Sequence, residues 1–542
     1  MVAQSLTDIP LIPAAVEGAR AAGLSRPNVI MRDRRQVEVR QAYPLPSRGE
    51  TTNYTLDLFL FLPRTMGVNP ATYPKADFYT DTHVYMRLDA PGRTVAELAD
   101  LKADQRSPLA QVHATLPRLL EARAPQTEPL VSLCQLHAHE LSEAVVASFS
   151  AAARSVRDGD FGSPDAFEKH VQKLLVDSEL SLVALRQVRA EAEAFGPLCH
   201  PGLQRALEFS EEYFSAVLDE QVALLSEAVR DSATLRDGSG TAVRVLLHLA
   251  AFAVEESKLR LEAGYAVPWD DQREYFAYRL GLLKKELQQA LYLNTRELKG
   301  DNYIRNSAAM VAAGLAATWA FVTQANMQLG QVTTGTQYAL LGSAVGAYML
   351  KDRIKEWTRD YLLRRVKLDD YSRAVVPETL ARFGLHGVGG RARERMRFVK
   401  PDDVEPEVRA LRLFHRSVMG TGVELEEVIH YRRRLTLSAT DKATVPPGFG
   451  IREILRLNTH ALTRRLDDPL DEVTFYDAPN GRFRRDSLPK VYHANLVVKV
   501  AADHAPLHWV SRSRLVLNQD GLVRVEPVVT RTAVHHARGK RD

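Results

Sequence analysis

The densest group of metal-capable residues in the chain is Cys134, His137, His139 and Glu140. Thiolate, imidazole and carboxylate groups are the usual protein ligands of zinc. On a helix Cys134 and His137 share a face, whereas His139 lies about 200° around the axis from His137. The side chains therefore do not converge on one ion, and no second ligand pair with zinc spacing is evident. We expect neither a metal nor a cofactor, and we interpret these residues as part of a helix.

One glycine-rich segment, Gly384 to Arg391, has a composition that could bind phosphate. Its backbone N–H groups could approach an anion, with Arg391 and Arg393 close in sequence. It lacks the Gly-Lys-Ser/Thr ending of a P-loop, and no clear strand precedes it. We predict a flexible linker, with anion binding as the alternative.

Arginines alternate with other residues in the stretch that follows this segment. They are Arg391, Arg393, Arg395 and Arg397, and Arg432 to Arg434 add to the basic character of the region. In an extended strand, alternate residues point to the same side, so these four guanidinium groups would share one face of a sheet. Such a face could meet anionic lipid, or it could be a solvated face whose charge protects a sheet edge.

Catalytic motifs are lacking. The chain has no Gly-x-Ser-x-Gly elbow and no kinase signature. Several histidines lie in the C-terminal region among many carboxylates, namely His415, His430, His493, His504 and His508. Sequence spacing does not show which of them converge in space, so no catalytic residue is assigned.

The longest charge-free stretch runs from Asn306 to Leu350. It is long enough for two membrane passes of about 17–25 residues with a turn between them. Small residues lie at helical spacing in both arms, as expected where helices pack closely in lipid: Ala308, Ala312, Ala316 and Ala320 in the first arm, and Gly342 and Gly346 in the second. We predict a transmembrane helical hairpin, with a buried hairpin inside a soluble protein as the alternative.

Basic residues flank this hairpin on both sides, whereas the turn between its arms is uncharged. They include Arg305 before it, and Lys351, Arg353, Lys355, Arg359, Arg364 and Arg365 after it. Excess positive charge marks the cytoplasmic side of a membrane protein. The pattern predicts a multi-pass protein of the inner (plasma) membrane with both termini cytoplasmic, its basic flanks lying at the membrane surface.

Composition limits the remaining classes. The chain has 542 residues, a formal net charge of +4 and two cysteines. This length predicts two to four domains, and two cysteines are too few for a disulfide framework. A small net charge argues against a dedicated nucleic-acid binder, so no nucleic-acid partner is expected. The expected partners are the lipid bilayer, a further copy bound through the hairpin and an unidentified protein.

We predict an α+β, mainly helical protein. The expected parts are a β-rich segment (1–92), a helical bundle with a juxtamembrane helix (93–305), the transmembrane helical hairpin (306–350), a basic juxtamembrane helix (351–374) and a C-terminal α+β domain (375–542). Alternating apolar residues indicate strands at 54–62 and 83–88, and further strands in the C-terminal domain, including 428–437, 472–476 and 492–500. Residues 451–466 are predicted to form a helix.

These parts suggest a two-span membrane protein with a scaffold or interaction role at the membrane face and no identified catalysis. Three alternatives stay open from the sequence. They are a membrane-associated enzyme with its site in the C-terminal domain, a pore or transport subunit formed by oligomerised hairpins, and a soluble protein with a buried hairpin.

Overall fold

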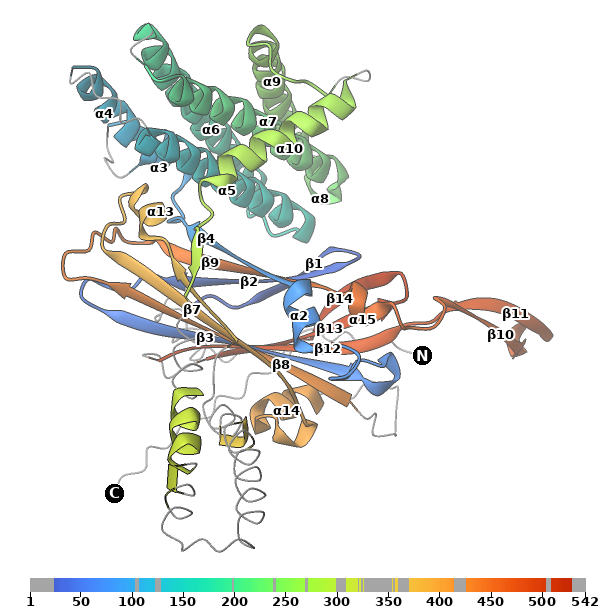
Figure 1. The fold of residues 1–542 in the computed structure, drawn as a ribbon. Helices are drawn as coiled ribbons and strands as arrows, with labels where there is room; N and C mark the ends of the chain where they lie inside the picture. Colours follow the sequence, from blue (N-terminus) through green and yellow to red (C-terminus); the bar gives the residue numbers. More distant parts are fainter. Residues whose placement is uncertain are drawn as a thin grey trace, which may run out of the picture.

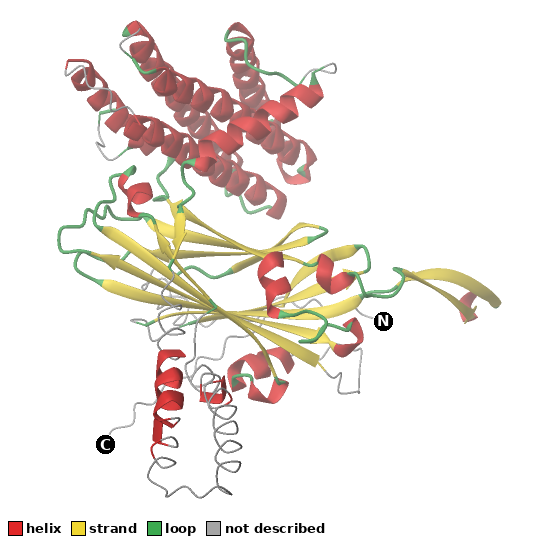
Figure 2. Cartoon of the chain, in the orientation of Figure 1, coloured by secondary structure: helices red, strands yellow, loops and turns green. Residues whose placement is uncertain are grey.

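The structure is a computed structural model of the whole chain. It describes residues 24–102, 107–121, 128–196, 199–236, 240–268, 272–298, 309–319, 321–322, 325, 353, 356–358, 370–413, 426–503 and 508–528. Its centre is a sandwich of two antiparallel sheets, with a bundle of helices above it (Figure 1; strands and helices are distinguished in Figure 2).

The smaller layer of the sandwich has the strand order β1-β2-β9-β4, and the larger has the order β14-β13-β12-β3-β8-β7-β6-β5. The strands of the smaller sheet are β1 (Asn28–Asp33), β2 (Gln36–Pro44), β4 (Thr82–Asp89) and β9 (Gly450–Asn458). Those of the larger sheet are β3 (Thr51–Pro63), β5 (Thr295–Glu297), β6 (Tyr371–Val375), β7 (Val388–Val399), β8 (Glu426–Ala439), β12 (Tyr492–Ala502), β13 (Trp509–Asn518) and β14 (Gly521–Val528). Strand β3 pairs with both β8 and β12, so the N-terminal and C-terminal β-rich segments share one sheet.

Alternate residues of each strand point toward the space between the sheets and form its apolar core. In β3, Tyr54, Leu56, Leu58, Leu60 and Leu62 point inward and belong to one buried cluster with residues of both sheets. Within the smaller sheet, β9 begins so close to β2 that a Cβ at Gly450 would lie 2.6 Å from the carbonyl oxygen of Tyr43. Only glycine fits there without a shift of the backbone.

The helical bundle is inserted between β4 and β5 and has its own apolar core. Its helices are α3 (Val95–Ala99), α4 (Pro108–Glu121), α5 (Glu128–Asp158), α6 (Pro164–Ala194), α7 (Pro201–Asp231), α8 (Ala233–Arg236), α9 (Thr241–Glu262) and α10 (Arg273–Gln289). Helix α6 has a well-formed start, because the Ser163 side chain accepts a hydrogen bond from Ala166 N and Pro164 occupies the first helical position. Leu136 of α5 packs against the core of the sandwich and joins the two parts.

Short helices and turns complete the sandwich. They are η1 (Arg64–Met66), α2 (Lys75–Asp81), α13 (Pro377–Ala381), η3 (Pro401–Asp403), α14 (Pro406–Leu413) and α15 (His460–Thr463). Helix α14 lies below the larger sheet in Figure 1, on the side away from the bundle. Val404 and Val408 pack there on Phe59, Phe61 and other residues of the outer sheet face.

A two-stranded ribbon projects from the sandwich. It consists of β10 (Leu470–Asp477) and β11 (Arg482–Pro489), joined by the turn η4 (Ala478–Asn480), and it extends to the side in Figure 1. Within the described part of the chain, neither strand pairs with any strand other than its partner.

The predicted transmembrane hairpin is corrected by the structure. Among the residues that the structure describes, no helix has the length and apolar character needed to cross a bilayer. The predictions of a two-span scaffold, of oligomerised spans and of an inner-membrane location are therefore wrong. The physical reason lies in composition, because Asn306–Leu350 owes its lack of charge largely to Ala, Gly, Ser and Thr, which favour lipid only weakly.

Most residues on which the hairpin prediction rested lie outside the described residues. They are Ala308, Ala320, Gly342 and Gly346, and the basic residues Arg305, Lys351, Lys355, Arg359, Arg364 and Arg365. Ala312 and Ala316 lie in a described helical stretch and are buried. Arg353 is exposed and forms an ion pair of 3.2 Å with Glu356, one helical turn away.

Residues 451–466 form strand β9 and the short helix α15, not the predicted single helix. Strand β9 lies between β2 and β4 and is buried on both faces. Because both of its faces are buried, its apolar residues do not alternate with polar ones. Ile451, Ile454 and Leu455 instead have the three- and four-residue spacing of an amphipathic helix, so local sequence does not distinguish this strand from a helix.

Candidate anion-binding face

The arginines of β7 and β8 gather on the outer face of the larger sheet. Antiparallel pairing places Arg393 directly opposite Arg434 and Arg395 directly opposite Arg432. Arg391 and Arg397 share this face because they are two residues from Arg393 and Arg395, respectively. We call Arg391, Arg393, Arg395, Arg397, Arg432 and Arg434 the arginine face. The alignment of the four β7 arginines confirms the prediction from their alternation.

Most of these guanidinium groups reach solvent. Arg391, Arg393, Arg397 and Arg434 are exposed, whereas Arg395 and Arg432 are half-buried. Arg391 Nε donates to Ser372 Oγ at 3.2 Å, and Arg397 Nε donates to His430 Nδ1 at 3.3 Å. Arg395 and Arg434 make no hydrogen bond or ion pair with another described residue. No carboxylate of the described residues therefore balances the charge of Arg391, Arg395, Arg397 or Arg434.

The arginine face brings like charges close together, although Asp57 balances the charge of Arg432. Like charges directly opposite each other on neighbouring strands destabilise a sheet, and arginine does not lose its proton at physiological pH. Residues i and i+2 of a strand lie about 6.8 Å apart, and neighbouring strands about 4.8 Å apart. An anion bound between these side chains would relieve the repulsion, so this arrangement can bind phosphate or carboxylate groups.

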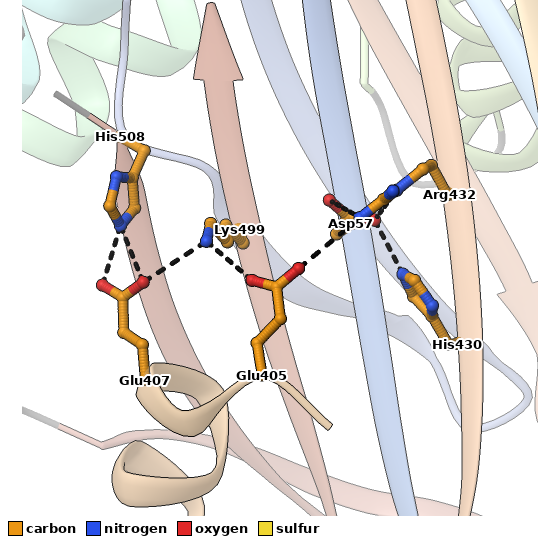
Figure 3. A network of polar contacts seen from close by, with 7 residues as sticks. All are labelled: Asp57, Glu405, Glu407, His430, Arg432, Lys499 and His508. Atoms are coloured by element: carbon orange, nitrogen blue, oxygen red, sulfur yellow. Dashed lines mark hydrogen bonds and ion pairs between the residues drawn. The ribbon is translucent and has the colours of Figure 1, made fainter. Parts of the chain in front are cut away.

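Arg432 is the exception, because it is held by Asp57 of β3 (Figure 3). Arg432 Nε donates to Asp57 Oδ1 at 2.6 Å, and His430 Nε2 lies 2.7 Å from the same oxygen. Burial would raise the pKa of Asp57, but hydrogen bonds from His430 and Arg432 outweigh burial and hold that pKa below its ordinary value. Asp57 is therefore an ionised anchor at the border of the arginine face.

The polar contacts continue from Asp57 toward α14 (Figure 3). Lys499 Nζ of β12 lies 2.8 Å from Glu405 and 3.3 Å from Glu407, and His508 Nε2 lies 2.7 Å from Glu407 Oε1. Burial would raise the pKa of Glu407, but the hydrogen bonds and charges of His508 and Lys499 lower it below its ordinary value. Charges of both signs balance here, so this network fixes α14 to the sheet.

The distance between His430 and Asp57 is that of a catalytic dyad, but the histidine is not accessible to a substrate. Arg397 donates to His430 Nδ1, which assigns the ring proton to Nε2, where it is donated to Asp57. His430 is buried and stacks on Phe59, with ring centroids 4.3 Å apart. Neither ring nitrogen is left to accept a proton from a substrate, so we interpret this histidine as structural.

Another cluster of charges lies between the two sheets. Arg433 of β8 donates to Glu453 at 2.7 Å and forms an ion pair with Glu394, which also accepts a hydrogen bond of 3.0 Å from Tyr431. All four side chains are buried. Burial would lower the pKa of Arg433, but its two carboxylate partners raise it above its ordinary value, so the guanidinium stays charged. This cluster joins the two layers of the sandwich.

The residues first considered as metal ligands lie on α5 near the junction with the sandwich. Cys134, His137, His139 and Glu140 are buried, and Glu140 forms an ion pair of 2.5 Å with Arg93. Burial lowers the pKa of both histidines to about 3, assisted by Arg93 at His137 and by Arg87 and Arg452 at His139. Within the described chain, no three histidine, cysteine or acidic side chains are grouped as metal ligands.

The glycine-rich segment forms the turn after α13 and the first residues of β7. A Cβ at Gly387 would lie 2.5 Å from Thr440 Oγ1 and 3.0 Å from Ala443 Cα, and one at Gly390 would lie 2.9 Å from Val375. Gly387 and Gly390 thus permit close packing against neighbouring backbone and side chains, whereas Gly384 adopts a positive φ of 76° that favours glycine. Packing and backbone conformation explain these three glycines without a bound phosphate.

A cavity of about 690 Å³ lies between residues 42–48 and 443–450. Tyr43, Arg48 and Asp89 are the ionisable residues of its lining, and Asp89 forms an ion pair of 2.5 Å with Arg452. The lining holds no histidine and no nucleophile paired with a base. The rival prediction of an enzyme in the C-terminal domain gains no support from this cavity, and His415 and His504 lie outside the described residues.

Sequence reasoning missed the network that borders the arginine face, namely Asp57, Glu405, Glu407 and Lys499. One local signal for it was present, because Asp57 is the single charged residue within the apolar stretch 54–62. A buried charge is rarely retained without a partner. Its partners, His430 and Arg432, lie 373 and 375 residues farther along the chain, and local sequence does not reveal them.

Comparisons with protein-family models, curated proteins and solved structures found no match to this chain. Its function is therefore inferred from its own residues.

Proposed function

We propose that the protein binds the phosphate backbone of a nucleic acid through its arginine face. The observation that carries this proposal is the register of β7 and β8, which places Arg393 opposite Arg434 and Arg395 opposite Arg432 on the outer face of the larger sheet. Guanidinium groups bind phosphate through two parallel hydrogen bonds and remain charged while doing so.

The spacing suits a regular polyanion. Alternate arginines of β7 recur about every 6.8 Å, which is close to two axial steps of about 3.4 Å per phosphate of one strand in a duplex. A strand of nucleic acid lying along β7 would place phosphates near successive guanidinium groups. Such contacts position a nucleic acid without reading its sequence.

The chemistry around the arginines favours a polyanion over a folded protein partner. Protein interfaces are centred on desolvated apolar anchors, often aromatic. None of the exposed large hydrophobic side chains of the described residues belongs to β3, β7 or β8. Exposed aromatic platforms, which bind unpaired bases, are absent from these three strands as well, and this favours a duplex.

The small net charge does not conflict with this proposal. The net charge of +4 is the sum over 71 basic and 67 acidic residues of the whole chain. Binding depends on how charge is distributed, and the arginine face concentrates six cations on two strands.

Fluorescence anisotropy tests the proposal with labelled DNA duplex, RNA duplex and single-stranded DNA at low salt. The triple variant Arg391→Gln/Arg395→Gln/Arg434→Gln should bind duplex roughly tenfold more weakly or worse, because about three phosphate contacts are lost. A control with Arg154→Gln/Arg157→Gln/Arg205→Gln removes equal charge from the helical bundle and should bind like wild type.

Three results would contradict the proposal: no binding of wild type to any nucleic acid at low salt, equal loss in both triple variants, or binding to vesicles of anionic lipid without binding to nucleic acid. The last result would assign the face to lipid headgroups.

A further inference from the structure

We propose that the β10–β11 ribbon is a self-association arm that pairs with the same ribbon of a second copy of this chain. The ribbon is exposed almost throughout, and only Asp477 and Asp486 are half-buried. An isolated two-stranded hairpin is marginally stable in water and usually needs a further layer to pack on. A well-formed ribbon without a covering layer therefore suggests a surface that packs against another molecule.

One side of the ribbon carries the apolar anchors for such packing. Cross-strand pairing puts Tyr476 opposite Phe483 at the tip and Leu470 opposite Pro489 at the base. Phe483 is 79% exposed, Leu470 58% and Tyr476 56%, and the two aromatic rings touch edge to face with centroids 5.3 Å apart. We call this side, which also carries Glu472, Thr474, Arg485 and Ser487, the aromatic face.

The charges of the ribbon favour a protein partner over a polyanion, because acidic and basic side chains are mixed on it. Residues 470–489 contain four acidic residues, Asp471, Glu472, Asp477 and Asp486, and three arginines, Arg482, Arg484 and Arg485. This near-neutral mixture differs from the arginine face. Aromatic residues combined with arginine are typical of protein interfaces.

The charge pattern of the aromatic face complements itself. Glu472 and Arg485 form an exposed ion pair between the aromatic tip and the aliphatic base. A twofold axis across the middle of this face would stack two ribbons antiparallel, which brings each Arg485 within reach of the Glu472 of the other copy. The same operation lays Tyr476 and Phe483 of one copy over Leu470 and Pro489 of the other. An isologous dimer requires such self-complementarity.

Sedimentation velocity of the full-length protein over a range of concentrations tests the proposal. Wild type should dimerise, and the double variant Tyr476→Ser/Phe483→Ser should shift toward monomer. Val473→Ser/Phe475→Ser removes comparable apolar side chains from the opposite side of the same ribbon and should leave dimerisation unchanged.

Charge reversal gives the sharper result. Glu472→Arg alone and Arg485→Glu alone each create like charges across the dimer and should weaken association roughly tenfold or more. Mixing the two variant chains in equal amounts should restore a heterodimer, because opposite charges then meet again. A merely structural ion pair within one ribbon would not be rescued by mixing.

A monomeric wild type at every concentration would overturn the proposal. Failure of the mixture to restore association would do the same, as would a dimer lost through the opposite side of the ribbon and not through the aromatic face.

Discussion

Three consecutive arginines of β8 have opposite environments. Arg433 points into the sandwich, where it is buried and contacts Glu394 and Glu453. Arg432 and Arg434 point outward, and Arg434 is exposed without a hydrogen bond or ion pair to any described residue. Arginine thus stabilises the fold on the inner face of β8, whereas on the outer face the charge of Arg434 is not neutralised by a described residue and is accessible to a ligand.

The difference follows from solvation. A buried guanidinium without carboxylate partners costs several kcal/mol, so the inner arginine is retained with two of them. An exposed guanidinium is solvated and needs no partner for folding, and single surface charges change stability by about 0.5 kcal/mol or less. The stability cost of removing each arginine should therefore separate structural residues from binding residues.

The largest expected effect is that of Arg433→Met. The substitution leaves Glu394 and Glu453 buried without a cation, and breaking a buried ion pair from one side costs about 3–5 kcal/mol. Urea denaturation should show this loss in the free energy of unfolding. Arg434→Met, one residue away, should change it by no more than about 0.5 kcal/mol. Equal losses in the two variants would contradict the contrast between the faces.

A somewhat smaller loss, about 3 kcal/mol at pH 7, is expected for Asp57→Asn, which removes the partner of His430 and Arg432. The folded-state pKa of Asp57 lies below its unfolded value near 3.9. Its contribution to stability is therefore fully present above pH 4 and declines as pH falls through the lower, folded-state pKa. The difference between wild type and variant should shrink in denaturation curves measured near pH 2, and a constant difference would argue against an ionised Asp57.

The pH dependence at the junction of the bundle and sandwich offers a third test. His137 is buried, neither of its ring nitrogens has a hydrogen-bond partner among the described residues, and burial lowers its pKa to about 3. A histidine that folds neutral leaves stability intact above its unfolded pKa near 6.5, and stability falls as pH drops from 6.5 toward 3. His137→Phe removes that dependence.

This variant should gain about 2 kcal/mol relative to wild type between pH 7.5 and pH 5, at about 1.4 kcal/mol for each pH unit below 6.5. Thermal or urea unfolding at both pH values measures the gain. His170→Phe, at an exposed position of α6, provides the control and should show no comparable change. A His137→Phe variant that is as acid-sensitive as wild type would refute the assignment.

The smallest expected effect on stability belongs to the arginine face itself. The variant Arg391→Gln/Arg395→Gln/Arg434→Gln removes three like charges, so its free energy of unfolding should stay the same or rise by a few tenths of a kcal/mol. Urea denaturation without ligand measures it. A marked loss of stability would mean that these arginines serve the fold.

The spacing of residues along the chain predicted the strands whose side-chain directions depend only on alternation. Alternation in 54–62 predicted β3, and alternation in 391–397 correctly placed four guanidinium groups on one face. The opposing arginines of β8 were not assigned to that face, because strand order and register depend on contacts between distant segments. The inward direction of Arg433 follows only once that register is known.

Two errors arose where different structures share one sequence pattern. A strand that is covered on both sides can space its apolar residues by three and four, as an amphipathic helix does. Residues 451–458 were therefore predicted to be helical although they form a strand. A charge-free stretch rich in small residues resembles a membrane hairpin in length but not in apolar character, which led to the wrong membrane prediction. For residues 451–458, burial by other segments, and not local sequence, decides the outcome.

The salt dependence of duplex binding tests the central claim most directly. The logarithm of the binding constant should fall linearly with the logarithm of salt concentration, with a slope of about −0.9 for each phosphate neutralised. We predict that Arg391→Gln/Arg395→Gln/Arg434→Gln reduces the magnitude of this slope by about 2.7 relative to wild type, whereas the matched bundle control leaves it unchanged. A slope equal to that of wild type in the arginine-face variant would show that nucleic acid, if bound, is bound elsewhere.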